Sequence, residues 1–234
     1  MLGRMTPSLT GMLTALGPLL HHDPMVARSR KISGQGVSAD RVLLTFPRAA
    51  MVQADPQVLG DLIGAKVPDA LTRHWQSAEI IHLGLDEADT TGDSVRKLYL
   101  EFSPETAPEQ GLAYLGLKVG TQTRLHRYDL LDDPTSVLAD LALPPDLRDF
   151  IYGLGAACPI LRVSEAGSAR LSLDIGLMDC APDKSLLDRL RRIVTDLNPT
   201  AAGPVIWPSH VAIGRDRNGL PFVTLYGWPD EASP

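Results

Sequence analysis

Lysine, tyrosine and acidic side chains alternate with leucines at Lys97, Tyr99 and Glu101 of this 234-residue chain. Side chains two residues apart in a β-strand point to the same side of the sheet, so these three would share one face. A cation on such a face attracts anions, and a tyrosine ring offers a flat apolar surface with a polar end. The spacing therefore predicts a sheet face that binds an anionic or aromatic small molecule.

The same alternation extends this polar face over the other predicted strands. Its candidate ligand-contacting residues are Lys97, Tyr99, Glu101, Tyr114, Lys118, Arg124, Tyr128, Arg170, Asp174, His210 and Tyr226. Glycines also fall on the polar face, at positions 84, 116, 176 and 214. A glycine inside a strand costs about 0.5–1 kcal/mol relative to alanine, so each needs a reason. We expect room for a ligand, close backbone approach or the coiling of a barrel.

The opposite side of each predicted strand is apolar, which indicates a core covered by helices. Most strands come as consecutive pairs joined by polar turns, and such hairpins are antiparallel. The predicted strands are 41–46, 79–86, 95–102, 112–119, 123–131, 160–165, 169–178, 209–215 and 221–227. Their order with the intervening helices predicts an α+β fold, an antiparallel sheet of successive hairpins with helices on its outer face. It leaves open whether the sheet closes into a barrel around a wet or ligand-lined interior.

Residues 1–40 are predicted to form an N-terminal arm or linker, and residues 41–230 a single α+β domain. A net charge of −6 argues against a nucleic-acid partner, since phosphate backbones attract basic surfaces. No stretch approaches the roughly 18 apolar residues of a membrane span, so we expect a cytoplasmic protein. The two cysteines, Cys158 and Cys180, are expected to be free thiols.

Three strand segments with basic and tyrosine side chains resemble a known family. They are Arg96-Lys97-Leu98-Tyr99, Leu125-His126-Arg127-Tyr128 and Thr224-Leu225-Tyr226. Strands of this kind, in successive antiparallel hairpins with outer helices, are similar to those of the aromatic prenyltransferases of the ABBA or PT-barrel type. The resemblance covers residues 79–228 and implies metal-independent transfer of a prenyl group from an allylic diphosphate to an aromatic acceptor. It implies neither a metal nor another cofactor.

The resemblance also implies a role for each matching residue. Basic side chains would hold the diphosphate, tyrosines would shield the developing allyl cation, and an acidic residue would orient or deprotonate the acceptor. The implied diphosphate partners are Lys97, Lys118, Arg124 and Arg170, and the implied shield is Tyr99, Tyr114, Tyr128 and Tyr226. Glu101 and Asp174 are the alternative acid–base residues. His210 is a further ligand contact that rests on its place on the polar face and not on the resemblance.

Two other functions fit the same polar face. One is a non-catalytic carrier or receptor for a small ligand, and the other is a module that docks a protein partner. Arginine and tyrosine are common at protein interfaces, so composition alone does not separate these functions from catalysis. The sequence therefore predicts a small-molecule-binding α+β protein and leaves its catalytic activity open.

Overall fold

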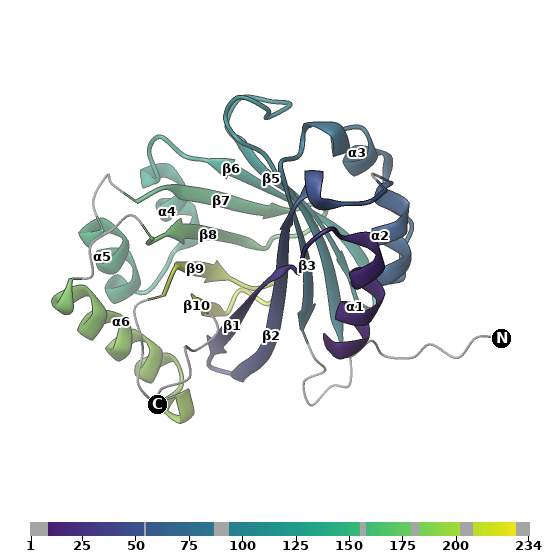
Figure 1. The fold of residues 1–234 in the computed structure, drawn as a ribbon. Coiled ribbons are helices and arrows are strands. Elements are labelled where there is room, and N and C mark those ends of the chain that lie inside the picture. Colours follow the sequence, from purple (N-terminus) through teal and green to yellow (C-terminus); the bar gives the residue numbers. More distant parts are fainter. Residues whose placement is uncertain are drawn as a thin grey trace. The chain divides into compact units, whose positions relative to one another are not determined.

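Ten strands form one antiparallel sheet that closes into a barrel in the computed structural model, which describes residues 9–53, 55–86, 94–154, 158–178, 183–201 and 208–227 (Figure 1). The order around the sheet is β1-β10-β9-β8-β7-β6-β5-β4-β3-β2. The predicted α+β fold of successive antiparallel hairpins is confirmed, and the question of closure is answered by this order. Two compact units make up the chain: the first unit is residues 1–27 with 40–126, and the second unit is residues 28–39 with 127–234.

The elements alternate along the chain as hairpins and short helices. The strands are β1 Met25–Ser33, β2 Gly36–Pro47, β3 Ile80–Asp86, β4 Val95–Glu101, β5 Leu112–Val119, β6 Thr123–Leu130, β7 Ile160–Glu165, β8 Leu171–Gly176, β9 His210–Arg215 and β10 Pro221–Gly227. The α-helices are α1 Leu9–Leu16, α2 Pro56–Ile63, α3 Asp69–Thr72, α4 Thr135–Leu141, α5 Pro145–Gly153 and α6 Lys184–Leu197. Single 3₁₀ turns lie at Gly17–Leu19, Arg48–Ala50, Trp75–Ser77 and Pro199–Ala201.

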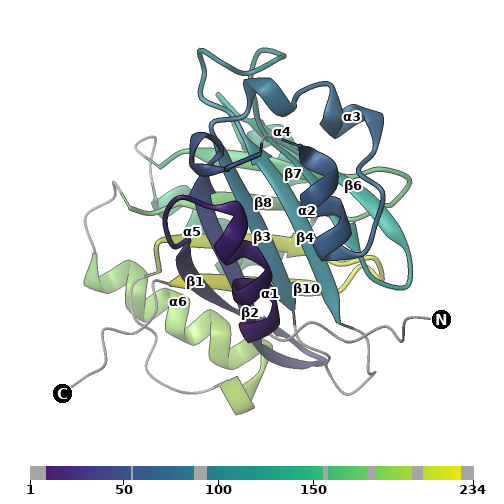
Figure 2. The same cartoon turned by 45° about the vertical axis from the view of Figure 1, so that its right-hand side comes forward.

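The core of the first unit lies between helices α1 and α2 and one side of strands β2 to β5. Figure 2 shows α1 and α2 running across this side of β3 and β4. Leu83, Leu98 and Leu117 stand opposite one another on β3, β4 and β5 and are fully buried. The Asp55 carboxylate caps α2 by accepting from the Gln57 N–H at 2.8 Å, as expected for an Asp-Pro helix start. The helix-covered face of these strands is the apolar face that alternation predicts.

The second unit repeats this arrangement with its own strands and helices. Leu173, Ile213 and Val223 are aligned across β8, β9 and β10, and all three are fully buried. Their cluster includes apolar side chains of α4, α5 and α6, which lie beside these strands in Figure 1. The Asp183 carboxylate caps α6 by accepting from the Ser185 N–H at 2.7 Å. The face left uncovered by helices is again the polar one.

The segment predicted as an arm or linker contains regular structure. Residues 9–16 form helix α1, residues 25–33 form β1, and β2 begins at Gly36, ahead of the predicted strand start at residue 41. Strand β1 pairs with β10 from Arg28↔Gly227 to Ser33↔Phe222. The backbone ladder of that pairing does not require apolar side chains, so its polar sequence does not reveal the strand.

Two further sequence predictions concern the cysteines and the membrane. Cys158 is disulfide-bonded, so its prediction as a free thiol is wrong, and Cys180 lies outside the described residues. Among the described residues, no helix is both long and apolar enough to cross a membrane. The cytoplasmic location stays a prediction.

Candidate functional site

Strands β2 to β5 of the first unit carry their polar side chains in three successive rows on the face opposite to the core. Because partners in an antiparallel ladder share a face, the register defines these rows. The first row contains Lys97 and Lys118, the second Thr45, His82, Tyr99 and Gly116, and the third Glu101 and Tyr114. Successive rows are two residues apart, about 7 Å along a strand. A cationic, an aromatic and an acidic zone therefore follow one another on this face.

The cationic zone is built around one carboxylate. The Lys97 ammonium and the Arg41 guanidinium both contact Oδ1 of Asp86, Arg41 at 3.2 Å, and Lys97 is buried. Burial alone raises the pKa of Asp86, but Lys97, Arg41 and Lys118 outweigh it, and the pKa lies well below its ordinary value. Asp86 is therefore ionised at neutral pH. Three cations around one carboxylate create a positive potential that favours binding of a further anion.

Two glycines allow side chains of β4 to lie over the neighbouring strands. A Cβ atom on Gly116 would stand 2.5 Å from Cδ1 of Tyr99, so the Tyr99 ring rests directly on the glycine backbone. A Cβ atom on Gly84 would stand 3.0 Å from Cδ of Lys97, whose chain crosses this strand toward Asp86. The space above both glycines is thus filled by these two side chains, and the glycines serve close packing rather than an open ligand space.

In the acidic zone, an imidazole connects a hydroxyl to a carboxylate. His82 Nδ1 is 2.8 Å from Oγ1 of Thr45, and its Nε2 is 2.7 Å from Oε2 of Glu101. The ring of Tyr114 lies 5.8 Å from the imidazole, centroid to centroid, and is tilted by 46°. Glu101 can therefore accept a proton from a ligand while its carboxylate is held in place from the side of His82.

The predicted site residues divide between the two units. Those in the first unit are Lys97, Tyr99, Glu101, Tyr114, Lys118 and Arg124, and the register above gathers all but Arg124 on one face. Arg124 lies on β6, where its guanidinium donates to the side-chain oxygen of Gln122. Those in the second unit are Tyr128, Arg170, Asp174, His210 and Tyr226. Tyr128 is on β6 and Arg170 immediately precedes β8.

The second unit holds a different charged cluster. The side chain of Glu165 is fully buried and accepts two hydrogen bonds of 2.7 Å from Arg217, with Arg170 at 3.8 Å. Burial raises the pKa of Glu165, but its bonds with Arg217 outweigh burial and lower the pKa below the ordinary value. Arg170 and Lys31 also lie 5.5 and 4.9 Å from the ring centre of Phe222, within the range of cation–π contacts.

The remaining predicted residues of the second unit share its polar face. Tyr226 stands opposite His210, and their rings meet edge-on with 6.4 Å between centroids. Asp174 stands opposite Ala212, one row away on the same face. His210 Nδ1 also lies 3.2 Å from the hydroxyl oxygen of Ser209.

Sequence reasoning missed the contributions of Arg41 and Thr45. Both lie on β2, where the even-numbered residues Val42, Leu44 and Phe46 are buried. This alternation was available in the sequence and would have placed the odd-numbered side chains on the polar face. The contacts with Asp86 and His82 were not available, because they depend on the pairing of β2 with β3.

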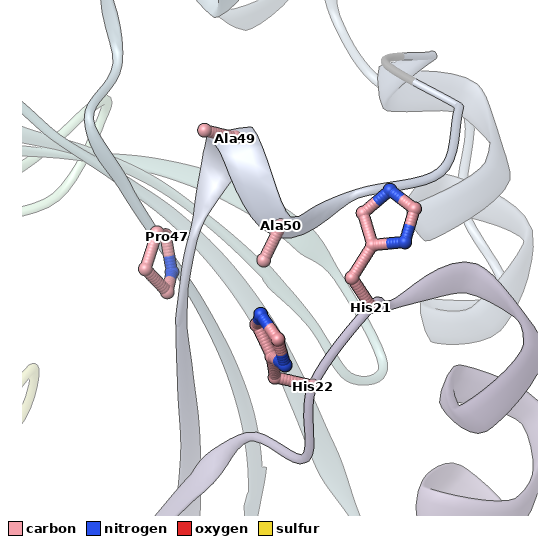
Figure 3. A pocket seen from close by; sticks show the side chains of 5 residues that line it. All are labelled: His21, His22, Pro47, Ala49 and Ala50. Carbon is pink, nitrogen blue, oxygen red and sulfur yellow. The ribbon is translucent and has the colours of Figure 1, made fainter.

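A shallow depression also lies in the first unit, where β2 ends. It is lined by His21 and His22 of the segment after the first 3₁₀ turn, by Pro47 at the end of β2, and by Ala49 and Ala50 of the 3₁₀ turn that follows (Figure 3). None of the predicted site residues lines it. Within the described parts of the chain, no three His, Cys, Asp or Glu side chains gather in a way that could hold a metal ion.

Among known proteins, the chain matches solved structures but no sequence family. No known sequence family matches the chain, and no curated protein matches it. Solved structures do match, among them 5-dimethylallyl tryptophan synthase from Streptomyces coelicolor in complex with DMASPP and Trp. That match has a TM-score of 0.59 and 13% identity, and covers 89% of this chain and 80% of the other. The chain has the fold of aromatic prenyltransferases.

Two further solved structures match this fold. AnaPT from Neosartorya fischeri matches with a TM-score of 0.54 and 12% identity, over 87% of this chain and 77% of its own. NotF in complex with brevianamide F and DMSPP matches with a TM-score of 0.53 and 11% identity, over 99% of this chain and 83% of its own. At such identities the likeness concerns the fold, and the activity has to be argued from the site.

Proposed function

We propose that the chain transfers a prenyl group from an allylic diphosphate to an aromatic acceptor, without a metal ion, on the polar face of the first unit. The observation that carries this proposal is the order of the three rows on β2 to β5. The cationic zone, Tyr99 and Glu101 succeed one another along β4 itself. That order is the one in which an allylic diphosphate, its prenyl group and the acceptor would lie.

The diphosphate binds in the cationic zone in this proposal. Lys97, Lys118 and Arg41 supply the positive charge, and Asp86 keeps Lys97 and Arg41 in position through its ion pairs. The same cations stabilise the charge that grows on the leaving diphosphate, which is the kind of preorganised electrostatic effect that lowers a barrier most.

Tyr99 lies in the row next to this zone and Tyr114 in the row beyond it, and both shield the allylic carbon in this proposal. When the C–O bond breaks, its electron pair leaves with the diphosphate and positive charge develops on the prenyl group. The faces of tyrosine rings stabilise such a cation through their quadrupoles. A pair of π electrons of the acceptor ring then forms the new bond to the prenyl carbon.

Glu101 completes the transfer as the general base. The acceptor ring carries an extra proton after the new bond has formed, and its loss to the carboxylate returns the electron pair to the ring. Glu101 is four residues from Lys97 on β4, about 14 Å along the strand. That span accommodates a five-carbon prenyl group followed by an aromatic ring.

The other predicted residues belong to different units. Arg124, which belongs to the first unit, is a further ligand contact in this proposal. The ligand contacts Tyr128, Arg170, His210 and Tyr226 and the alternative base Asp174 belong to the second unit and stay predictions of their own. Structures of the same fold support the proposal, since one of them is a complex with DMASPP and Trp and another with DMSPP.

Calorimetric titration with dimethylallyl and geranyl diphosphate tests the cationic zone. We expect binding by the wild type and about 10–100-fold weaker binding by Lys97→Met, because a charge-assisted contact is worth about 1.5–3 kcal/mol. Lys66→Met is the matched control, since it removes the same charge from an exposed residue that lies outside the three rows. If neither diphosphate binds the wild type, or both variants weaken binding equally, the proposal is wrong.

Incubation with phenolic or indole acceptors separates catalysis from carriage. We expect the release of inorganic diphosphate together with a prenylated product. If the donor binds tightly but no diphosphate is released in the presence of any acceptor, the protein is a ligand carrier and not an enzyme.

A further inference from the structure

We propose that Thr45 and His82 are positioning residues for Glu101, which hold it as an oriented, ionised proton acceptor through the neutral Nε2–H tautomer of the His82 ring. This inference rests on the proposed function for the role of Glu101 as a base. Its structural part rests on the two hydrogen bonds of the His82 ring alone. These bonds join β2, β3 and β4 in one continuous chain of polar groups.

The chemistry of the three groups selects this tautomer. An ionised carboxylate can only accept hydrogen bonds, so the nitrogen that faces Glu101 at 2.7 Å must carry a proton. That nitrogen is Nε2. In the neutral ring Nδ1 is then an acceptor, and the Thr45 hydroxyl at 2.8 Å is the donor that satisfies it. The opposite tautomer would point the Nε2 lone pair at the carboxylate.

The surroundings of His82 hold the ring in this orientation. Thr45 stands directly opposite His82 in the β2–β3 ladder, and a threonine has few side-chain rotamers in a strand. Tyr114 contacts the ring from β5. The imidazole is therefore held between groups from two other strands, as a positioning residue must be to transmit an orientation.

Glu101, the proposed base, is more exposed to solvent than His82, its positioning residue. The side chain of Glu101 is 27% exposed, against 11% for His82. The carboxylate is thus the group that an acceptor molecule can reach, while His82 lies behind it. His82 engages Oε2, so the acceptor's proton would go to the remaining lone pairs of the carboxylate.

Nitrogen-15 NMR of the histidine side chains at pH 7.5 tests the tautomer without any substrate. His82→Gln identifies the His82 signals by their disappearance. In the wild type we expect a protonated Nε2 and an unprotonated Nδ1 that accepts a hydrogen bond, and in Thr45→Val we expect the Nδ1 signal to shift because its donor is gone. Thr45→Ser keeps the hydroxyl and should preserve the wild-type signal. An Nδ1–H ring or an imidazolium in the wild type, or an unchanged spectrum in Thr45→Val, overturns the proposal.

Steady-state kinetics then test whether the tautomer matters for Glu101. Because the donor diphosphate binds elsewhere on the face, Thr45→Val should lower kcat about tenfold, the effect of one lost hydrogen bond, with the KM for the donor unchanged. Thr45→Ser should recover most of the lost turnover. Equal losses in Thr45→Val and Thr45→Ser, or a change confined to KM, would indicate a merely structural role and overturn the proposal.

The two experiments keep this inference separate from the proposed function. A wild type that turns over no allylic diphosphate disproves the prenyl-transfer proposal, and with it the catalytic half of the inference. The NMR spectra still decide whether Thr45 and His82 hold the carboxylate as described.

Discussion

Each unit has a hydrogen-bonded glutamate on its polar face, Glu165 in the second unit and Glu101 in the first. The two carboxylates have different kinds of partner, an arginine for Glu165 and a histidine for Glu101. In the second unit, the side chain of Glu165 is fully buried and accepts hydrogen bonds from two nitrogens of the Arg217 guanidinium, Nε and Nη2. In the first unit, Glu101 is partly exposed and is bonded to the imidazole of His82. A carboxylate locked by arginine is stabilised as an anion and fixed in place. One that is bonded to a histidine and partly exposed is more accessible to a ligand, which is why the proposed proton transfer is assigned to the first unit.

The largest expected effect compares the two alternative bases. Glu101→Gln should lower turnover about 10²–10⁴-fold, the usual contribution of a general base, because the amide keeps the shape and loses the basicity. Asp174→Asn in the second unit should have a much smaller effect. Both variants are measured by diphosphate release at saturating donor. A larger loss in Asp174→Asn would move the proton transfer to the second unit and reverse the comparison.

The Glu165 cluster should show a stability effect that depends on which partner is removed. Arg217→Ala removes both 2.7 Å hydrogen bonds from a buried carboxylate and leaves Arg170 at 3.8 Å, so we expect a loss of about 3 kcal/mol in the free energy of unfolding. Glu165→Gln leaves an arginine whose side chain is half exposed and can turn into water, so we expect about 1 kcal/mol. Urea denaturation at pH 7 measures both. If the two variants lose the same free energy of unfolding, the unpaired buried carboxylate is not the main source of the destabilisation.

The glycines of the two polar faces should respond differently to an added methyl group. A Cβ on Gly214 in the second unit would lie 2.5 Å from the carbonyl oxygen of Leu171, which is backbone and cannot move aside. A Cβ on Gly116 in the first unit would meet the Tyr99 ring, which can turn away. We expect Gly214→Ala to cost about 3 kcal/mol and Gly116→Ala about 1 kcal/mol, measured by urea denaturation.

Gly120→Ala is the control for both glycine variants. Its added Cβ would meet only Cγ2 of Val95 at 3.5 Å, an ordinary contact, so stability should stay close to that of the wild type. Gly116→Ala should also weaken ligand binding through the displaced Tyr99. If Gly116→Ala is as stable as Gly120→Ala and binds the ligand as the wild type does, the position of the Tyr99 ring has no role in binding.

The smallest effect concerns the acid stability of the cationic zone. Since the pKa of Asp86 is lowered in the folded state, its stabilising contribution is complete above the unfolded pKa, near 3.9, and is lost as the pH falls toward the lower folded value. Between pH 5 and pH 3 this linkage should remove about 1 kcal/mol. The difference between wild type and Asp86→Asn in the pH dependence of unfolding isolates it. Parallel curves for the two proteins would mean that Asp86 titrates normally.

Local sequence patterns predicted most of the strands and the side of the sheet on which each residue lies. Lys97, Tyr99 and Glu101 share the polar face because alternation is a property of a single strand. The cap of α2 is also a local feature, since the Asp55 carboxylate bonds to a backbone N–H only two residues on. Strand β1 was missed, because its polar sequence becomes a strand only through the ladder with β10.

The sequence by itself determined which residues lie on the polar face, because side chains alternate between the two faces of a strand with a period of two residues. Only the tertiary structure decided which polar groups meet. Thr45, His82 and Glu101 come from three strands; the first two are 37 positions apart in the sequence and the last two are 19 positions apart. Alternation states the side of a strand but not its partner, because register is set by turn lengths and by packing across strands that are distant in the chain. The hydroxyl–imidazole–carboxylate chain is a product of that register.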